Sequence, residues 1–403
     1  MKTALRSAIF LLLATSALTS PARAGDVPAA VNAIFKIWET QLKTKPTYEK
    51  LEDDGSGNIT ITNLAVNLAA DGPQPGVKLT MGSLQLSGVA EESGGIIEIG
   101  SATFSDTKVE FNSPEGQTFS AEMPKGTAEG WYVAVVGDNP TPQQAFRAGM
   151  GSIAKKLSSN EIKITAMGQT ITSAGYESTW DGDPVTGAGK FAMTLGDVVI
   201  PEALIATADT AGQLKQLGYG DLTITASGSG ELTVGDGTFG MSGDVSYGVK
   251  DMGGVKMAFA ASDVPTGTVV ELQKAQKEGR APDFNALMPQ LMNASIGNLQ
   301  LRFEDASITK KMLPIIAKMQ GMDEAAMVAN AGAMMQIGLM HLKNQAFTDQ
   351  VLGAVNAFLA DPKSFTVSVK PSAPVKVQQL MTLDPTNPGA AIDTLGVSVT
   401  SND

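Results

Sequence analysis

The sequence predicts an α+β fold in which long, strongly curved antiparallel β-sheets, connected as a meander, wrap amphipathic helices. Many short runs alternate apolar and polar residues and are separated by glycine-rich turns, as expected for antiparallel strands. The alternation changes parity inside some of these runs, which predicts bulges that bend the sheet. Apolar residues at helical spacing occur near the beginning of the chain and again in its last third.

Residues 1–24 have the pattern of a cleavable signal peptide. Basic Lys2 and Arg6 precede a short apolar run, and a small-x-small cleavage site ends at Ala24. The apolar run is shorter than the roughly 20 residues that span a bilayer, so we expect cleavage after Ala24. A lipid anchor would need a cysteine after the cleavage site, and the chain contains none. The expected mature protein is therefore released, with no stable membrane anchor.

The absence of cysteine limits the possible cellular location, and the acidic net charge limits the possible partners. An exported protein without disulfides is typical of bacteria, and we expect the periplasm of a Gram-negative bacterium. The chain carries 29 basic and 41 acidic side chains; without Lys2, Arg6 and Arg23 the balance is 26 against 41, a net charge of −15. Such a charge repels the phosphate backbone, which excludes nucleic acid as a partner.

The region 25–265 is predicted to be β-rich, with two helices. The first lies near 28–45, where apolar residues recur at helical spacing. The second lies near 141–158, because Thr141 is a suitable cap and Pro142 needs no amide partner in the first turn. The apolar face of this second helix is expected to consist of Phe146, Met150, Ile153 and Leu157.

Strands are predicted between these two helices and again after the second helix, to about residue 259. In the first group the alternation changes parity between Ile61 and Leu64 and again between Met81 and Leu84. A bulge at each of these places is expected to give the sheet a strong bend.

The region 266–403 is predicted to be helix-rich and to complete the sheet. Apolar stripes at helical spacing occur over 284–292 and 351–359. Alternating runs over 299–303, 365–369 and 395–399 are typical of strands. Because strands flank the helices, an isolated all-α domain is not expected.

The sequence offers no recognisable catalytic or metal centre. His341 is the sole histidine, which excludes a His-pair metal site, and it lies in an apolar helical run. No G-x-S-x-G elbow, phosphate-binding loop or dinucleotide fingerprint occurs. The aspartate-rich segments 54–58 and 181–183 are interpreted as solvated hairpin tips and not as calcium loops. We therefore expect no cofactor, no metal and no enzymatic activity.

Methionines are concentrated near His341, and three roles are open for them: core packing, an apolar-ligand surface, or Cu(I) binding through thioethers. Core packing is favoured, because these methionines lie on apolar helices and not among polar residues. The run from Ala325 to Met340 is the best membrane-spanning candidate, but it falls short of roughly 20 residues, which favours a buried helix. For a ligand surface, the candidate lining residues are Met312, Met319, Met327, Met334, Met335, Leu291, Met292 and Phe358.

The C-terminal third carries a resemblance to known proteins. A strand closes in Phe303-Glu304-Asp305 before a helix at 310–313, and the tail alternates over 365–371 and 395–400. In this pattern the chain resembles uncharacterised periplasmic proteins of alphaproteobacteria and, more distantly, the YdgA-like and AsmA-like envelope proteins. The resemblance implies a curved β-sheet enclosing helices and a role in envelope lipid homeostasis. The cleavable leader distinguishes this chain from AsmA-like proteins.

These observations together predict a non-enzymatic periplasmic protein. A curved sheet around amphipathic helices would create an apolar trough, which suits a lipid, an acyl chain or an envelope partner. The alternative is a structural or interaction protein of the cell envelope with no ligand cavity.

Overall fold

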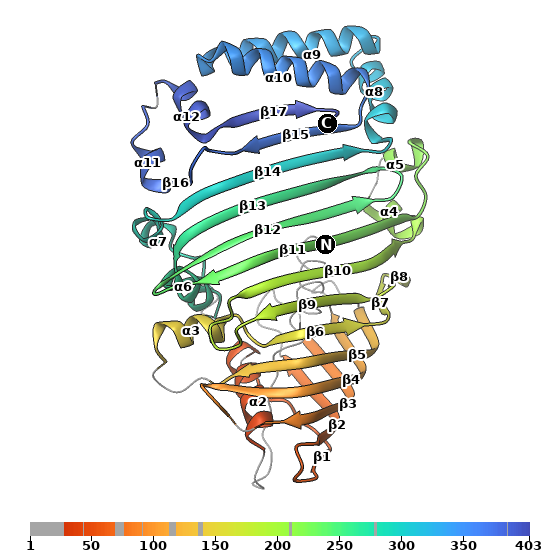
Figure 1. Ribbon diagram of the computed structural model, residues 1–403. Helices are drawn as coiled ribbons and strands as arrows, with labels where there is room; N and C mark the ends of the chain where they lie inside the picture. Colours follow the sequence, from red (N-terminus) through yellow and green to blue (C-terminus); the bar gives the residue numbers. More distant parts are fainter. Residues whose placement is uncertain are drawn as a thin grey trace. The chain divides into compact units, whose positions relative to one another are not determined.

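The computed structural model describes residues 28–403, except 43, 69–75, 91, 113–117, 136–139, 209–211, 278–279 and 385 (Figure 1). The signal-peptide prediction for residues 1–24 lies outside the described residues. The chain divides into two compact units: unit 1 comprises residues 1–208 and 269–282, and unit 2 comprises 209–268 and 283–403. Each unit is described separately below.

Unit 1 is built on antiparallel strands. Its strands are β1 (Lys50–Asp53), β2 (Ile59–Leu68), β3 (Val77–Val89), β4 (Ile96–Asn112), β5 (Thr118–Ala134), β6 (Ile153–Ser159), β7 (Ile162–Ala166), β8 (Gln169–Ser173), β9 (Tyr176–Gly182) and β10 (Gly189–Ile200). Strands β1 to β5 pair in sequence order; β5 then pairs with both β6 and β7, and β10 pairs with both β8 and β9. Its helices are α2 (Ala29–Leu42), α3 (Pro142–Gly149) and α4 (Glu202–Ala208), with α6 (Thr266–Lys277) spanning the boundary between the units.

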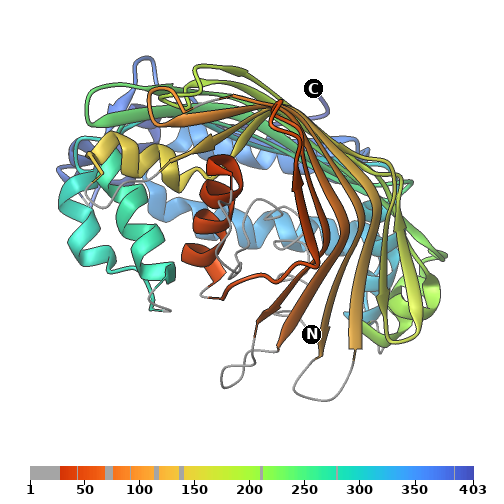
Figure 2. The ribbon, with the colours of Figure 1, turned by 90° about the horizontal axis from the view of Figure 1, so that it is seen from below.

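The first four long strands of unit 1 bend along one shared line, and Figure 2 shows the bend. The predicted parity changes are confirmed: Ile61 and Leu64 are both buried, as are Met81 and Leu84. The register itself does not shift, because Thr62 pairs with Ser83 and Leu64 with Met81. Both strands change parity together, so the feature is a paired kink and not a bulge with one extra residue.

The kink continues across the neighbouring strands as a row, which we call the crease. It consists of Asn63 on β2, Gly82 on β3, Asp106 on β4 and Pro124 on β5, placed opposite one another by the pairings on either side. Asn63 and Asp106 both have left-handed backbone conformations, with φ of 51° and 53°. Asparagine and aspartate tolerate this conformation better than most residues, which explains why polar residues interrupt the alternation here.

Helix α2 covers the apolar face of this sheet. Val31 and Ile34 are buried, and Phe35 stacks on Tyr48 with ring centroids 6.0 Å apart. Beneath them the sheet contributes fully buried side chains such as Leu84 and Ile99. The predicted helix near 28–45 is confirmed, and it provides one layer of the core of unit 1.

The second predicted helix is only half correct. The capping box forms as expected, with the Gln144 backbone N–H donating to Thr141 Oγ1 at 3.2 Å. The helix ends at Gly149, however, and residues 153–159 form strand β6, in which Ile153 pairs with Tyr132 of β5. Gly151 has a φ of 73°, which breaks the helix, and the spacing of Ile153 and Leu157 fits a strand as well as a helix.

Arg147 attaches helix α3 to the rest of unit 1. Its side chain is buried and donates from Nε to the Pro184 carbonyl oxygen at 2.8 Å and from Nη1 to the Gly151 carbonyl oxygen at 2.6 Å. Burial lowers the pKa of the guanidinium to about 10, and Asp183 partly offsets that effect. Backbone carbonyls therefore satisfy a charge that would otherwise be costly to bury.

Unit 2 combines a second antiparallel sheet with most of the helices. Its strands are β11 (Leu222–Val234), β12 (Thr238–Val249), β13 (Gly253–Pro265), β14 (Ser295–Asp305), β15 (Ser364–Val369), β16 (Val375–Lys376) and β17 (Val397–Ser401). Its helices are α5 (Gln213–Gln216), α7 (Phe284–Leu291), α8 (Ile308–Met319), α9 (Glu324–Leu339), the 3₁₀ turn η1 (Met340–Leu342), α10 (Gln345–Ala360), α11 (Val377–Met381) and α12 (Pro388–Leu395). The sheet order is β11–β12–β13–β14–β15–β17, with β16 pairing with the start of β14.

The observed structure confirms the β-rich α+β class, with 47% of residues in strands and 30% in helices. The strands predicted over 299–303 and 365–369 are β14 and β15. The strand predicted over 395–399 is β17, but it begins only at Val397, because Leu395 ends α12 and Gly396 caps that helix with a φ of 57°. The compact units divide differently from the predicted regions 25–265 and 266–403, because β11 to β13 belong to unit 2. The predicted boundary near Thr266 does not divide the sheet, because β13, which ends at Pro265, pairs with β14.

Candidate functional site

The sheet of unit 2 has one face made almost entirely of apolar side chains. In the register of β12, β13 and β14, Tyr247 lies beside Val255 and Val255 beside Phe303. The next two rows along these strands are Val245, Met257 and Leu301, and then Gly243, Phe259 and Leu299. Successive residues of a strand point to opposite faces, so these rows share a single face.

Much of this apolar face is exposed to solvent. Tyr247 is 56% exposed, Leu301 50% and Leu299 45%, and Val255 and Met257 are each more than one-third exposed. We call the part over β11 to β14 the open face. The Tyr247 hydroxyl is the only hydrogen-bonding side-chain group in the three rows. A contiguous exposed apolar patch of this kind typically marks a binding surface.

Helix α10 covers the rest of the same face, at strands β15 and β17. Val351 and Ala354 of the helix pack with Val399 of β17. The Phe358 ring makes edge contacts with Phe303, at 6.1 Å between centroids, and with Phe365, at 5.7 Å. The open face therefore begins where the cover provided by α10 stops.

The opposite face of the sheet is polar and paired. Arg302 donates from Nε to Glu304 at 3.1 Å and from Nη1 to Asp403 at 2.5 Å, and Lys256 contacts Glu304 at 2.9 Å. The contact with Lys256, followed by that with Arg302, lowers the pKa of Glu304. A hydrogen bond from Thr400, followed by the contact with Arg302, lowers the pKa of Asp403. The charges of the sheet are thus gathered away from the open face.

The predicted lining residues do not form one surface. Leu291 and Met292 lie at the end of α7, and Met312 lies on α8, so strand β14 separates them; its 11 residues span about 36 Å. Met327 is buried, Met319 and Met334 are exposed, and Met335 packs against the cluster around α10. Among all of them, Phe358 lies directly on the apolar sheet face, beside the open part.

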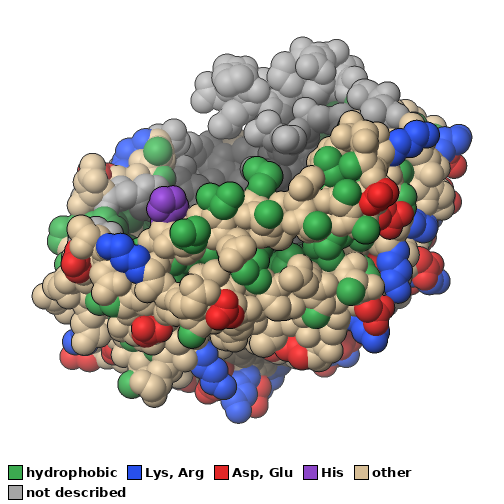
Figure 3. All heavy atoms as spheres, turned by 90° about the horizontal axis from the view of Figure 1, so that it is seen from above, with side chains coloured by type: hydrophobic (Ala, Val, Ile, Leu, Met, Phe, Trp, Pro, Cys, Tyr) green, Lys and Arg blue, Asp and Glu red, His purple; other side chains and the backbone are tan. Residues whose placement is uncertain are grey.

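Helix α9 contradicts the prediction that the run from Ala325 to Met340 is a buried helix. Among the described residues, the helical stretch Glu324–Leu342 is long and apolar enough to cross a membrane, yet only 6% of its most apolar window is buried. Met334 is 75% exposed and Met340 70%. Figure 3 shows apolar side chains on the side of unit 2 that carries this helix. The run is apolar as predicted, but the described chain covers only Met327 and the side of the helix that faces α10.

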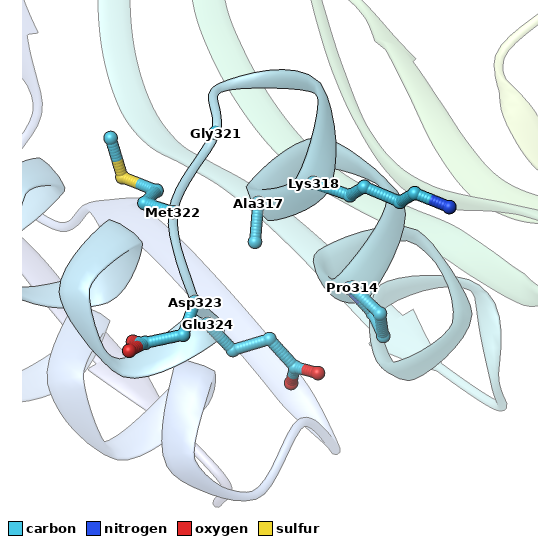
Figure 4. Close-up of a pocket in the computed structure, with 7 residues that line it drawn as sticks. All are labelled: Pro314, Ala317, Lys318, Gly321, Met322, Asp323 and Glu324. Atoms are coloured by element: carbon cyan, nitrogen blue, oxygen red, sulfur yellow. The ribbon is translucent and has the colours of Figure 1, made fainter.

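A hollow of about 410 Å³ lies at the corner between α8 and α9 (Figure 4). Pro314 and Ala317 line it from α8, and Asp323 and Glu324 from the start of α9. Asp323 is engaged in capping, since it accepts the Ala326 backbone N–H at 2.7 Å. The hollow holds no group of metal-binding side chains, and none occurs elsewhere among the described residues. His341, the sole histidine, is exposed.

A second hollow, of about 230 Å³, lies in unit 1 beside α3. It is lined by Gly94, Gly95, Ile96, Ala134, Val135, Thr141, Gln143, Gln144, Arg147 and Val185. Arg147 is the only charged residue in this lining, and it is engaged with backbone carbonyls. Neither of these two hollows lies on the open face, whose side chains are exposed.

The open face was missed at the sequence level, although its signal is present there. Residues 299, 301 and 303 alternate with polar neighbours, and 255, 257 and 259 lie in a similarly alternating run. The alternation predicts one apolar face, but it does not show whether another element covers that face. The cover depends on the position of α10, which is a property of the tertiary structure.

Comparison with known proteins gives a limited result. A protein-family model described as "Uncharacterized protein" matches residues 246–402. No curated protein and no solved structure matches the chain. The matched segment runs from within β12 to just past the end of β17. It contains β13, β14 and helix α9, but it does not contain β11.

Proposed function

We propose that this protein is a non-enzymatic periplasmic protein that binds the acyl chain of a lipid on the open face of unit 2. The observation that carries the proposal is the solvent exposure of adjacent apolar rows on β12, β13 and β14. In water, covering this surface with an apolar ligand is favourable, because each Å² of apolar surface that is buried lowers the free energy by roughly 25 cal/mol.

The chemistry of the open face supports an acyl chain over a polar ligand. Its three rows contain no charge and a single hydroxyl, so they offer little to orient a sugar, a nucleotide or a peptide backbone. From β11 to β14 the face spans about 14 Å across the strands, at roughly 4.8 Å per strand. We further propose that the bend of the sheet and the side of α10 make the open face a trough, as the resemblance to AsmA-like envelope proteins implies.

The periplasmic location rests on the sequence. The signal-peptide pattern of residues 1–24 predicts export, and a chain with no cysteine fits a periplasmic protein that is stabilised by its core alone. Edman sequencing of the protein purified from a Gram-negative host tests this directly. A mature N-terminus at Gly25 is expected, and an intact Met1 in the cytosolic fraction would contradict it.

A matched pair of variants on β14 tests the acyl-chain proposal. Leu301→Glu places a charge on the open face, whereas Gln300→Glu places the same charge one residue away on the polar face. We expect Leu301→Glu to weaken binding of a fluorescent long-chain fatty acid by about tenfold or more, equivalent to about 1.4 kcal/mol. Gln300→Glu should bind like the unsubstituted protein. Equal binding by both variants would show that the open face is not the site.

The alternative is a structural or interaction protein, and the openness of the face is the observation that favours it. Ligand pockets enclose most of a small molecule, whereas protein partners bind to open surfaces. Native mass spectrometry of the protein purified from its own periplasm distinguishes the two. A bound lipid supports the proposal; a ligand-free mass, together with no uptake of the fluorescent fatty acid, would replace it with the alternative.

A further inference from the structure

Helix α9 is apolar on every side, yet it lies at the surface of unit 2. From 325 to 342 the chain contains no lysine, arginine, aspartate or glutamate. A surface helix of a water-soluble protein normally carries polar residues on its outer side, and a helix that is apolar all round is normally buried in protein or in a membrane. The described residues provide no such cover, because only 6% of the most apolar window is buried.

The contacts of α9 use a strip along one side and, near its start, the buried Met327. Met335 and Leu339 pack toward α10, and Val328 lies on the same strip at helical spacing. The other sides of α9 and η1 carry the exposed residues Ala326, Ala329, Ala333, Met334, Ile337 and Met340, with Asn330 and Gln336 as polar exceptions. The strip fixes which side of α9 faces α10, and these exposed residues lie on its other sides.

We infer that α9 is a membrane-docking helix that lies in the plane of a bilayer, with Met334, Ile337 and Met340 among the acyl chains of one leaflet. By length and composition the helical stretch Glu324–Leu342, which includes η1, could cross a bilayer. Met335 and Leu339, however, pack against the cluster around α10, and this packing holds the helix against unit 2. The packing favours an in-plane position over a spanning one.

The charges near the two ends of the helix differ. Asp323 and Glu324 directly precede the uncharged run, Lys318 at the end of α8 is the nearest cation before them in the sequence, and Lys343 follows η1. Within the described residues Lys318 makes no ion pair, and Lys343 donates only to the Thr386 carbonyl oxygen, at 2.9 Å. Flexible lysines at the ends of an apolar segment can reach lipid phosphates while their stems remain in the interface.

A second copy of the chain fits the surface less well than a bilayer. Helix pairs in water use an apolar seam flanked by charged residues that fix the register, and α9 has no such flanks. A bilayer requires no register and covers a broad apolar surface. Methionine is flexible enough to adapt to such a disordered environment.

The absence of cysteine allows a direct test. Ile337→Cys, labelled with an environment-sensitive fluorophore, gives a single probe on the outer side of α9, and Met381→Cys on α11 is a matched exposed control. With vesicles of phosphatidylethanolamine and phosphatidylglycerol, we expect a blue shift and quenching by brominated acyl chains at position 337 and neither at 381. Unchanged emission at position 337 would overturn the inference.

A second measurement uses the exposed side chains themselves. The triple variant Met334→Lys, Ile337→Lys and Met340→Lys should lower co-flotation with the same vesicles by about 100-fold, because each change removes apolar contact and adds a charge at acyl-chain depth. Met381→Lys should float like the unsubstituted protein, and circular dichroism should show that both variants remain folded. If the triple variant instead abolishes a dimer seen in sedimentation without vesicles, a second copy occupies α9 and the inference fails.

These outcomes do not depend on acyl-chain binding by the open face. A protein that docks on vesicles but takes up no fluorescent fatty acid would support membrane docking and contradict the proposed function. The reverse result would contradict only the docking of α9.

Discussion

Both units contain an antiparallel sheet with an apolar face, but helices cover that face to different extents. In unit 1 the apolar face is closed by helix α2, and Leu84 and Ile99 are fully buried beneath it. In unit 2 helix α10 covers β15, β17 and, on β14, Phe303, whereas Leu301 on β14 is half exposed. Both faces follow from alternating sequences, so the difference lies in which helix covers which strands. Unit 1 uses its apolar residues for stability, and in our proposal unit 2 keeps part of them for a ligand.

The largest expected difference between the units is in the cost of removing a leucine side chain. Leu84→Ala should lower the free energy of unfolding of unit 1 by about 2–5 kcal/mol, because it leaves a cavity in a closed core. Leu301→Ala should cost unit 2 less than about 1 kcal/mol, since the side chain is already half in solvent.

The chain allows the two units to be monitored separately in urea titrations. All three tryptophans, Trp38, Trp131 and Trp180, belong to unit 1, so tryptophan fluorescence reports on that unit. The unfolding of unit 2 is followed by hydrogen exchange at the backbone amides of β14. Similar losses for Leu84→Ala and Leu301→Ala would show that the open face is covered in solution.

A smaller contrast is expected between two arginines. Arg147→Met in unit 1 should cost about 2–4 kcal/mol, because it leaves the buried carbonyl of Gly151 and the part-buried carbonyl of Pro184 without donors. Arg302→Met in unit 2 should cost no more than about 1 kcal/mol, since its partners Glu304 and Asp403 are reachable by water. Thermal unfolding of the two variants measures the difference, and an equal loss in both would contradict the assignment of Arg147 as a buried clamp.

The smallest expected effect is a dependence of unit 2 on acid. In the folded state Lys256 is the main cause that lowers the pKa of Glu304, and Thr400 is the main cause that lowers the pKa of Asp403. Arg302 lowers both pKa values further. Their contribution is fully present above the ordinary carboxyl pKa values, near 4, and is lost as the pH falls through the lowered values. Between pH 6 and 3, Arg302→Met should reduce the acid-induced loss of hydrogen-exchange protection on β14. The tryptophan signal of unit 1 should not change with this variant, and a change there would argue against a local effect.

Local pattern was sufficient to predict most strands and helices. The parity changes around Ile61 and Met81 correctly located the bend, because side-chain period is a local property of a strand. The predicted helix at 141–158 failed at Gly149, since Ile153 and Leu157 satisfy both helical and strand spacing. The pairing of Ile153 with Tyr132 decides between them, and that contact is not visible in the local sequence.

The candidate site was less predictable than the fold. The sequence showed that the run from Ala325 to Met340 is apolar, and apolar helices are buried far more often than they are exposed. Whether α9 is covered depends on α10 and on the strands beneath it, which come from distant parts of the chain. The same is true of Leu299 and Leu301, whose exposure depends on where α10 ends its cover of the sheet.

The crease in unit 1 restricts how the lengths of its strands can vary among related sequences. Asn63, Gly82, Asp106 and Pro124 lie opposite one another, and beyond this row each strand presents the other parity to the core. Deleting Gly82 alone would move the side chains of β3 that follow it to the opposite face of the sheet, because a one-residue slip exchanges the two faces. Sequences that share this architecture should therefore gain or lose residues at the crease in all four strands together. Single insertions and deletions should be confined to the hairpin turns.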